Sequence, residues 1–121
     1  MRKDGAEQRS PVSLEDNLKK ALTELLILYL LSQREHYIGE LTDEMREKSG
    51  GVLSVSFPYA VIYRMTRSGY ISESEKRRAP DHRLRQYYRI TDEGRLYLTG
   101  LLEVYARFTE GVAKVLEEGM P

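Results

Sequence analysis

The fold is decided by residues 52–91, which read VLSVSFPYAVIYRMTRSGYISESEKRRAPDHRLRQYYRIT. A helix is predicted from Phe57 to Ser68, because the first turn tolerates Pro58 and Gly69 can end the helix. Two polar strands are predicted on either side of a tip at residues 79–83. The stretch therefore indicates a helix that is followed at once by a two-stranded ribbon.

The predicted helix has one apolar face. A helix turns by about 100° per residue, which places Pro58, Val61, Ile62 and Met65 on the same side. The residues that then point away from the core are Tyr59, Ala60, Tyr63, Arg64 and Arg67. The outer face is thus aromatic and positively charged.

Positive charge is also concentrated in the ribbon. The whole chain has net charge +0, with 19 basic and 19 acidic residues, so the distribution is more informative than the sum. Between residues 76 and 89, Asp81 is the single acidic residue, and the basic residues are Lys76, Arg77, Arg78, Arg83, Arg85 and Arg89. Like charges gathered next to an arginine-bearing helix favour a phosphate backbone as partner over a merely solvated hairpin.

Two helices are predicted before this stretch. The first runs from about Asn17 to Ser32, and a capping box is proposed in the tetrapeptide that starts at Ser13. The second runs from about Ile38 to Lys48, where Gly50 and Gly51 stop it. Residues 1–12 show no apolar period and are predicted to form a flexible arm.

A long helix is predicted after the ribbon, capped by Thr91 and running to about Glu118. At about 1.5 Å per residue it would be ~40 Å long, which exceeds the small domain it leaves. Apolar residues recur in it with the spacing of a coiled-coil seam, and they are Leu98, Leu101, Tyr105, Phe108, Val112 and Val115. The seam predicts a homodimer.

Other functional classes lack their motifs. The chain has no cysteine, its two histidines lie in different segments, and no glycine-rich phosphate loop is present, so we expect no enzyme, no metal site and no cofactor. The apolar run at residues 25–31 is far shorter than the ~20 residues that a membrane span needs. The N-terminus also lacks the apolar core of a signal peptide, so a cytoplasmic protein without a membrane partner is expected.

The chain resembles the PadR family of bacterial and archaeal transcriptional regulators, in the short form with one C-terminal dimerisation helix. The resemblance is carried by YIGEL at residues 37–41, by Tyr59 and the residues up to Ile71, and above all by RQYYRITDEG at residues 85–94. The chain departs from the usual family pattern at residues 56–58, which are Ser-Phe-Pro where Gly-Thr-Leu is common. The resemblance implies a winged helix-turn-helix regulator and a DNA contact for Tyr59.

Some members of that family sense aromatic small molecules between the first and last helices of the dimer. The resemblance implies that a corresponding pocket in this chain would be lined by Tyr29, Tyr97, Tyr105 and Phe108. Ordinary packing at the seam is the alternative for these aromatic residues.

A helix-turn-helix inserts the first turns of its recognition helix into the major groove, while phosphate contacts fix the register. The residues expected to contact DNA are Ser56, Tyr59, Tyr63, Arg64, Arg67, Arg77, Arg78, Arg83 and Arg85. Arg67 is expected at a phosphate, and Tyr59 has packing against the preceding helix as its alternative. Which arginine reads a base stays open.

The predicted fold class is α+β, mainly α: a winged helix-turn-helix with a long C-terminal dimerisation helix. It comprises an arm at residues 1–12, a DNA-binding domain at 13–91 and a dimerisation helix at 92–121. The expected function is that of a homodimeric repressor on a pseudo-palindromic operator in double-stranded DNA, responsive to an aromatic small molecule. The alternative is a winged helix that binds a protein partner and no DNA.

Overall fold

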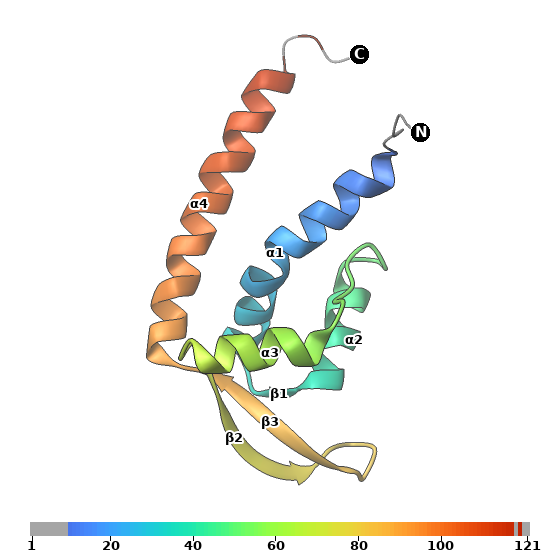
Figure 1. Ribbon diagram of the computed structural model, residues 1–121, viewed down its shortest axis with the longest axis vertical. Coiled ribbons are helices and arrows are strands. Elements are labelled where there is room, and N and C mark those ends of the chain that lie inside the picture. The colour runs from blue at the N-terminus through green and yellow to red at the C-terminus, as the bar shows by residue number, and fades with distance from the viewer. Residues whose placement is uncertain (1–9, 118, 120–121) are drawn as a thin grey trace, which may run out of the picture.

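The computed structural model describes residues 10–117 and 119. Its elements follow the order α1 (Pro11–Gln33), β1 (His36–Tyr37), α2 (Ile38–Lys48), α3 (Pro58–Arg67), β2 (Ile71–Arg78), β3 (Leu84–Ile90) and α4 (Asp92–Leu116). The wing formed by β2 and β3 projects on one side of α3, and α1 and α4 rise on the other side and diverge (Figure 1). This mainly helical architecture confirms the predicted winged helix-turn-helix with a long C-terminal helix.

The core lies where α1, α2 and α3 meet the base of the wing. Its most deeply buried side chains include Ile27 and Leu28 of α1, Leu41 of α2, Met65 of α3 and Ile71 of β2. In α3 the buried residues are Val61, Ile62 and Met65, as the helical period predicted. The opposite face of α3 is exposed, because no second element of the described residues packs against it.

The start of α1 differs from the prediction. The helix begins at Pro11, and its N-cap residue is Ser10, whose side chain forms no capping hydrogen bond. The amide of Ser13 instead donates to the carbonyl oxygen of Ser10 at 3.0 Å. The predicted capping box is therefore wrong: Pro11 fits the first helical position, where no amide donor is needed, and it starts the helix earlier. Of the predicted arm, residues 10–12 belong to this helical start, and residues 1–9 lie outside the described part of the chain.

The later helix ends agree better with expectation. Helix α2 spans Ile38–Lys48, as predicted, and α3 lies within the predicted run with one residue fewer at each end. Helix α4 is capped by Thr91, whose hydroxyl oxygen accepts a hydrogen bond from the amide of Gly94 at 2.9 Å. That cap confirms the prediction, and the helix ends at Leu116 rather than near Glu118.

A short strand, β1, was not predicted. It pairs with β3 in antiparallel register, with His36 opposite Tyr88 and Tyr37 opposite Tyr87, so the sheet order is β1-β3-β2. A segment of two residues is too short to show the alternating pattern of a strand, so it can be recognised as one only from its pairing with β3. Their pairing ties the wing to the connection between α1 and α2.

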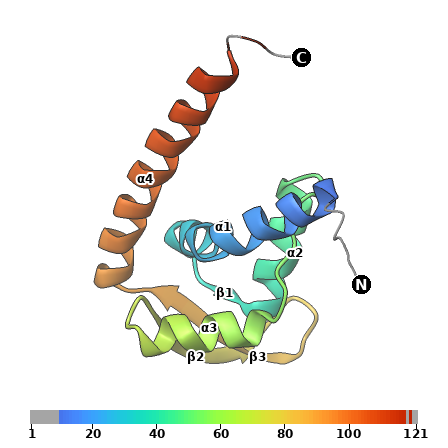
Figure 2. The ribbon, with the colours of Figure 1, turned by 45° about the horizontal axis from the view of Figure 1, so that its top comes forward.

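The root of α4 is packed tightly against the start of the wing. A Cβ atom on Gly94 would lie 2.0 Å from the carbonyl oxygen of Tyr70, a distance that no side chain tolerates. The rings of Tyr70 and Tyr97 stack with centroids 4.1 Å apart and an interplanar angle of 9°. Leu98 is buried in the core, whereas the outer half of α4 stands apart from the body in both ribbon views (Figures 1 and 2).

Candidate nucleic-acid interface

The outer face of α3 presents a prearranged group of aromatic and basic side chains. Tyr59 is 73% exposed and Tyr63 is 63% exposed. Arg67 donates a hydrogen bond to the Tyr63 hydroxyl at 3.0 Å, and its guanidinium lies 5.7 Å from the centre of that ring. The helical spacing of four residues brings Tyr63 and Arg67 together, so they can contact one ligand as a unit.

Arg64 lies on the flank of α3 that faces α1. Its Nε and one terminal nitrogen both donate to Oε2 of Glu24, at 3.0 and 2.9 Å. The two side chains are 58% and 30% exposed. A contact between this guanidinium and DNA would therefore compete with Glu24, which makes Arg64 less available than Arg67.

Phe57, which precedes α3, is an exposed residue beside the predicted interface that the sequence reasoning did not single out. It is 80% exposed and has φ 55° and ψ 55°, the left-handed region. That conformation costs a residue with a side chain about 1–2 kcal/mol. The helical pattern placed Phe57 inside the helix, but a residue before proline is disfavoured in the right-handed helical region, so Pro58 begins α3 and leaves Phe57 outside it. Ser56 is exposed in the turn just before it.

Two of the wing arginines are held by partners in the body and the wing. Arg77 donates to Glu35 at 3.0 Å and to Glu75 at 3.1 Å, and its guanidinium lies 3.6 Å from the centre of the Tyr87 ring. The hydrogen bond from Arg77 lowers the pKa of the Glu35 carboxyl below its usual value. Arg77 therefore joins the wing to the segment after α1 and is not a free surface charge.

Arg85 is held in a similar way at the other strand. It donates to Asp81 at 2.7 Å, and its guanidinium lies 5.1 Å from the centre of the Tyr37 ring. This hydrogen bond lowers the pKa of the Asp81 carboxyl. The pair links the tip to β3, and the charge of Arg85 is partly neutralised by Asp81.

The other two wing arginines that were predicted to contact DNA are the more available ones. Arg78 donates to the carbonyl oxygen of His82 at 2.8 Å, a bond that leaves its charge uncompensated. Within residues 10–117 and 119, the guanidinium of Arg83 has no hydrogen-bond or ion-pair partner, and the residue is exposed. His82 turns the tip with φ 68°, a region that histidine enters more readily than most residues. Arg78 and Arg83 are thus the wing residues best placed for phosphate groups.

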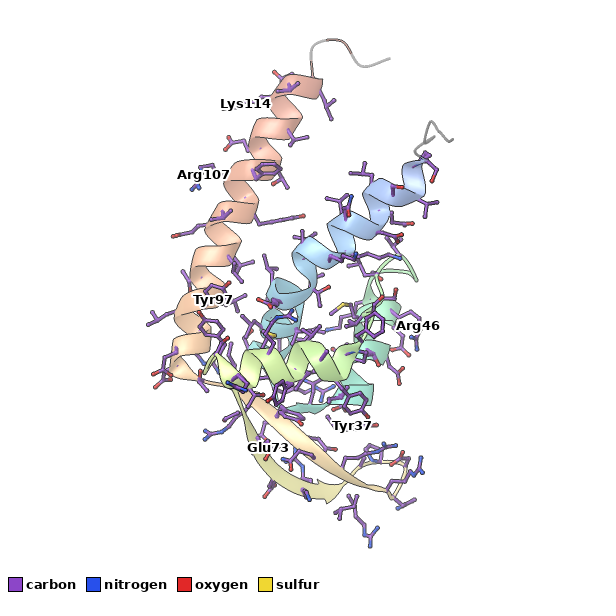
Figure 3. All side chains as sticks on the ribbon, viewed as in Figure 1. Tyr37, Arg46, Glu73, Tyr97, Arg107 and Lys114 are labelled. Atoms are coloured by element: carbon purple, nitrogen blue, oxygen red, sulfur yellow. The ribbon has the colours of Figure 1, made fainter. Side chains whose placement is uncertain are left out.

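A small hollow of about 220 Å³ lies between α3 and the wing. Tyr37, Tyr59 and Tyr88 line it together with Arg85 and Gln86. Burial raises the pKa of the Tyr37 and Tyr88 phenols above its usual value, which favours the protonated form that can donate a hydrogen bond. Figure 3 shows Tyr37 between α2 and the wing. Tyr37 and Tyr88 were missed because strand pairing of β1 with β3, invisible in the local sequence, brings them beside Tyr59.

A sequence model of the PadR-like family of transcriptional regulators matches residues 27–100. The matched segment runs from the core of α1 through the helix-turn-helix and the wing into α4. The chain belongs to the PadR-like family. Because this family consists of transcriptional regulators, the chain is a DNA-binding regulator and not an enzyme.

Solved structures with PadR-like names share the fold. A PadR-like transcriptional regulator from Bacillus cereus is 25% identical with a TM-score of 0.75, covering 85% of this chain and 99% of that one. A PadR family regulator from Eggerthella lenta is 23% identical with a TM-score of 0.74, covering 89% and 93%. The circadian clock associated protein Pex from Anabaena is 19% identical with a TM-score of 0.61, covering 76% and 81%, and shares the fold alone. No curated protein sequence matches the chain significantly.

The PadR-like fold places a groove of about 470 Å³ between α1 and α4. Tyr97, Tyr105 and Phe108 line it, as does Arg64 of α3. Tyr29 lies elsewhere, in a hollow of about 240 Å³ beside α2 that Met45 and Lys48 also line. The structure thus brings together three of the four aromatic residues predicted for a ligand pocket.

The predicted seam on α4 is divided in the same way. Leu98 is buried in the core of its own chain, and Leu101 is packed against that core. Tyr105 is 44%, Phe108 71%, Val112 44% and Val115 79% exposed. Val104, 51% exposed, was not predicted for the seam but lies in the groove as well.

In the described residues no helix is long and apolar enough to cross a bilayer.

Proposed function

We propose that this PadR-like regulator is a homodimeric repressor whose α3 enters the major groove of operator DNA. The observation that carries the proposal is the exposed face with Tyr59, Tyr63 and Arg67, which continues into the arginines of the wing. An arginine fork can bind two acceptors of guanine, and tyrosine hydroxyls can bind phosphate or base edges. A solvent-facing helix without a ligand would not need this combination of tyrosine and arginine side chains on its exposed face.

The wing would supply phosphate contacts that do not depend on sequence. Arg78 and Arg83 carry this role in the proposal, because neither charge is neutralised by an acidic side chain of the described residues. Arg77 and Arg85 would instead hold the wing in shape through Glu35 and Asp81. Each phosphate contact contributes about −0.9 to the slope of log affinity against log salt concentration.

The outer half of α4 supports the dimer. Its exposed apolar side chains continue the seam beyond the point where the helix leaves its own body, and α1 carries exposed Leu14 and Leu18 on its outer turns. A solvent-exposed stripe of this length is what a partner helix covers in a coiled coil. The two recognition helices would then lie about 34–36 Å apart and contact successive major grooves of a pseudo-palindromic operator.

The groove between α1 and α4 is the proposed place for an aromatic effector. Tyr97, Tyr105 and Phe108 offer ring faces, and the groove also reaches Arg64 on the recognition helix. A ligand there would lie within contact of both the dimer helix and α3, so it could change DNA affinity without touching DNA. A thermal-shift screen of planar aromatic compounds tests this part, with Tyr105→Ala as the variant that should lose any hit.

The DNA proposal is tested by fluorescence anisotropy on labelled duplex DNA over a salt series. The double variant Arg78→Ala with Arg83→Ala should weaken binding to all duplexes alike and flatten the salt slope by about 2. Lys114→Ala is the matched control, because it removes one positive charge from the far end of α4 (Figure 3). An affinity that does not change with salt would favour the alternative, a winged helix that binds a protein.

A further inference from the structure

Phe57 has a strained, left-handed backbone conformation for which the packing of the fold gives no reason. It is the N-cap residue of α3, and its side chain forms no capping hydrogen bond. Its carbonyl oxygen accepts from the amides of Ala60 and Val61 at 3.1 and 3.2 Å, so the helix start depends on the backbone at this position and not on the ring. Glycine or asparagine would enter the left-handed region more easily than phenylalanine.

The exposure of the ring excludes a role in the core. At 80%, Phe57 is the most exposed of the large apolar side chains in the described residues. The ring borders the polar hollow between α1 and α3, whose other lining residues include Lys19, Lys20 and Ser56. A strained residue that contributes little packing points to a function outside the folded chain.

Pro58 keeps the backbone of Phe57 outside the helix. Proline at the first helical position fixes its own φ and disfavours the helical region for the residue before it. The helix therefore cannot extend backward through Phe57, and the ring stays ahead of the first turn of α3. In a helix-turn-helix this end of the recognition helix lies nearest to the base edges.

We propose that Phe57 is a specificity-determining residue that contacts the C5-methyl group of a thymine in the major groove. This methyl group is the apolar feature that distinguishes thymine there, and phenylalanine is among the side chains that can contact it. Ser56 carries a hydroxyl directly before the ring, and the Tyr63–Arg67 pair lies further along α3, so polar groups for phosphates and bases stand on the same helix. The inference rests on the proposed entry of α3 into the major groove.

The test begins with selection of a preferred duplex from a random library by the wild-type chain. Each thymine of that duplex is then replaced by deoxyuridine, which deletes the methyl group alone. At one thymine per half-site the wild type should lose about fourfold in affinity, the factor that corresponds to ~0.8 kcal/mol for one buried methyl-sized group. Phe57→Asn should bind less tightly and show no loss at that thymine.

Two further arms separate the outcomes. Phe57→Asn should raise the melting temperature, because asparagine tolerates the left-handed conformation and can cap the helix, whereas a structural role of the ring predicts a lower one. Leu96→Asn removes a side chain that is 76% exposed on α4 and should keep the thymine response. An identical deoxyuridine response in Phe57→Asn and wild type overturns the inference and would leave the ring to a protein partner. Failure of the wild type to bind any duplex at low salt would instead contradict the proposed function.

Discussion

The two halves of α4 belong to one continuous helix, but only the inner half finds its partners within its own chain. From Asp92 to Leu101 the helix is fixed by the close approach of Gly94 to Tyr70, by the stacked Tyr70 and Tyr97 rings and by buried Leu98. From Leu102 onward every described residue is exposed, although Tyr105, Phe108 and Val112 are apolar or aromatic. The difference teaches that one seam pattern can pack within the chain at the start of the helix and, in the proposed dimer, form the surface for a partner further along.

The largest expected effect comes from adding a methyl group at the root of α4. Gly94→Ala should lower the free energy of unfolding by about 3 kcal/mol, the upper end for overpacked sites, because the clashing atom is a backbone oxygen. Gly111→Ala in the outer half, where nothing lies within 4 Å, should instead raise it by up to about 1 kcal/mol through helix propensity. Urea denaturation followed by circular dichroism measures both, and equal effects of the two substitutions would remove the distinction between the halves.

A charge in the outer half should separate the subunits without unfolding them. Phe108→Glu is expected to convert a dimer into a monomer, because Phe108 is 71% exposed in the chain and would be buried only by a partner. Binding to a two-half-site operator should weaken by ~100-fold, the size of effect that loss of bivalence produces. Sedimentation measures the oligomeric state of the variant, and its helical content shows whether it remains folded. A wild-type chain that sediments as a monomer at micromolar concentration would contradict the proposed seam.

Two arginines of α3 show the same contrast, because one is paired with an acidic side chain of its own chain and the other is not. Arg64 is paired with Glu24, whereas Arg67 contacts only the neutral Tyr63 hydroxyl among its described hydrogen bonds. Glu24→Gln should release Arg64 and raise DNA affinity a fewfold, while stability falls by less than ~1 kcal/mol, as for other surface pairs. Arg67→Ala should lower the affinity. A weaker DNA complex in Glu24→Gln would show that the ion pair positions Arg64 for binding.

The smallest expected effect concerns acid stability of the body. A hydrogen bond from Lys48, and then one from His36, lowers the pKa of the Glu44 carboxyl below its ordinary value of 4.5. A lowered pKa in the folded state adds stability above pH 4.5 that is lost as the pH falls further and the carboxyl becomes protonated. Glu44→Gln should flatten that loss by ~1 kcal/mol or less. Denaturation at pH 7 and pH ~3.5 measures it, with Glu110→Gln on the outer half of α4 as the control.

The local features of the fold could be predicted because each depends on a few neighbouring residues. Helix α2 ends at Lys48, just before Gly50 and Gly51, α3 buries Val61, Ile62 and Met65, and Thr91 caps α4. These are properties of turn chemistry and helical period, which the sequence shows directly. The basic wing and the exposed Tyr63 followed from the same reasoning.

What could not be predicted depends on residues that are distant in the sequence. The pairing of Arg64 with Glu24 and of Arg77 with Glu35 requires three-dimensional contact, so the arginines looked equally free in the sequence. Tyr29 and Leu98 carry the right residue types for a pocket and a seam, yet the packing of α1 and α4 turns them toward other neighbours. The left-handed backbone of Phe57 could not be predicted either, because its proline neighbour disfavours the helical region without selecting the left-handed one.

The short strand β1 has a consequence for how the chain is made. His36 pairs with Tyr88, which is synthesised long after it, so the edge of β1 has no partner until β3 has left the ribosome. Helices form within about a microsecond and hairpins within ~10 μs, whereas pairing of distant segments must first close the intervening loop. We therefore expect α1 and α2 to form early in synthesis, and the three-stranded sheet to assemble as one of the last steps, when the wing docks onto β1.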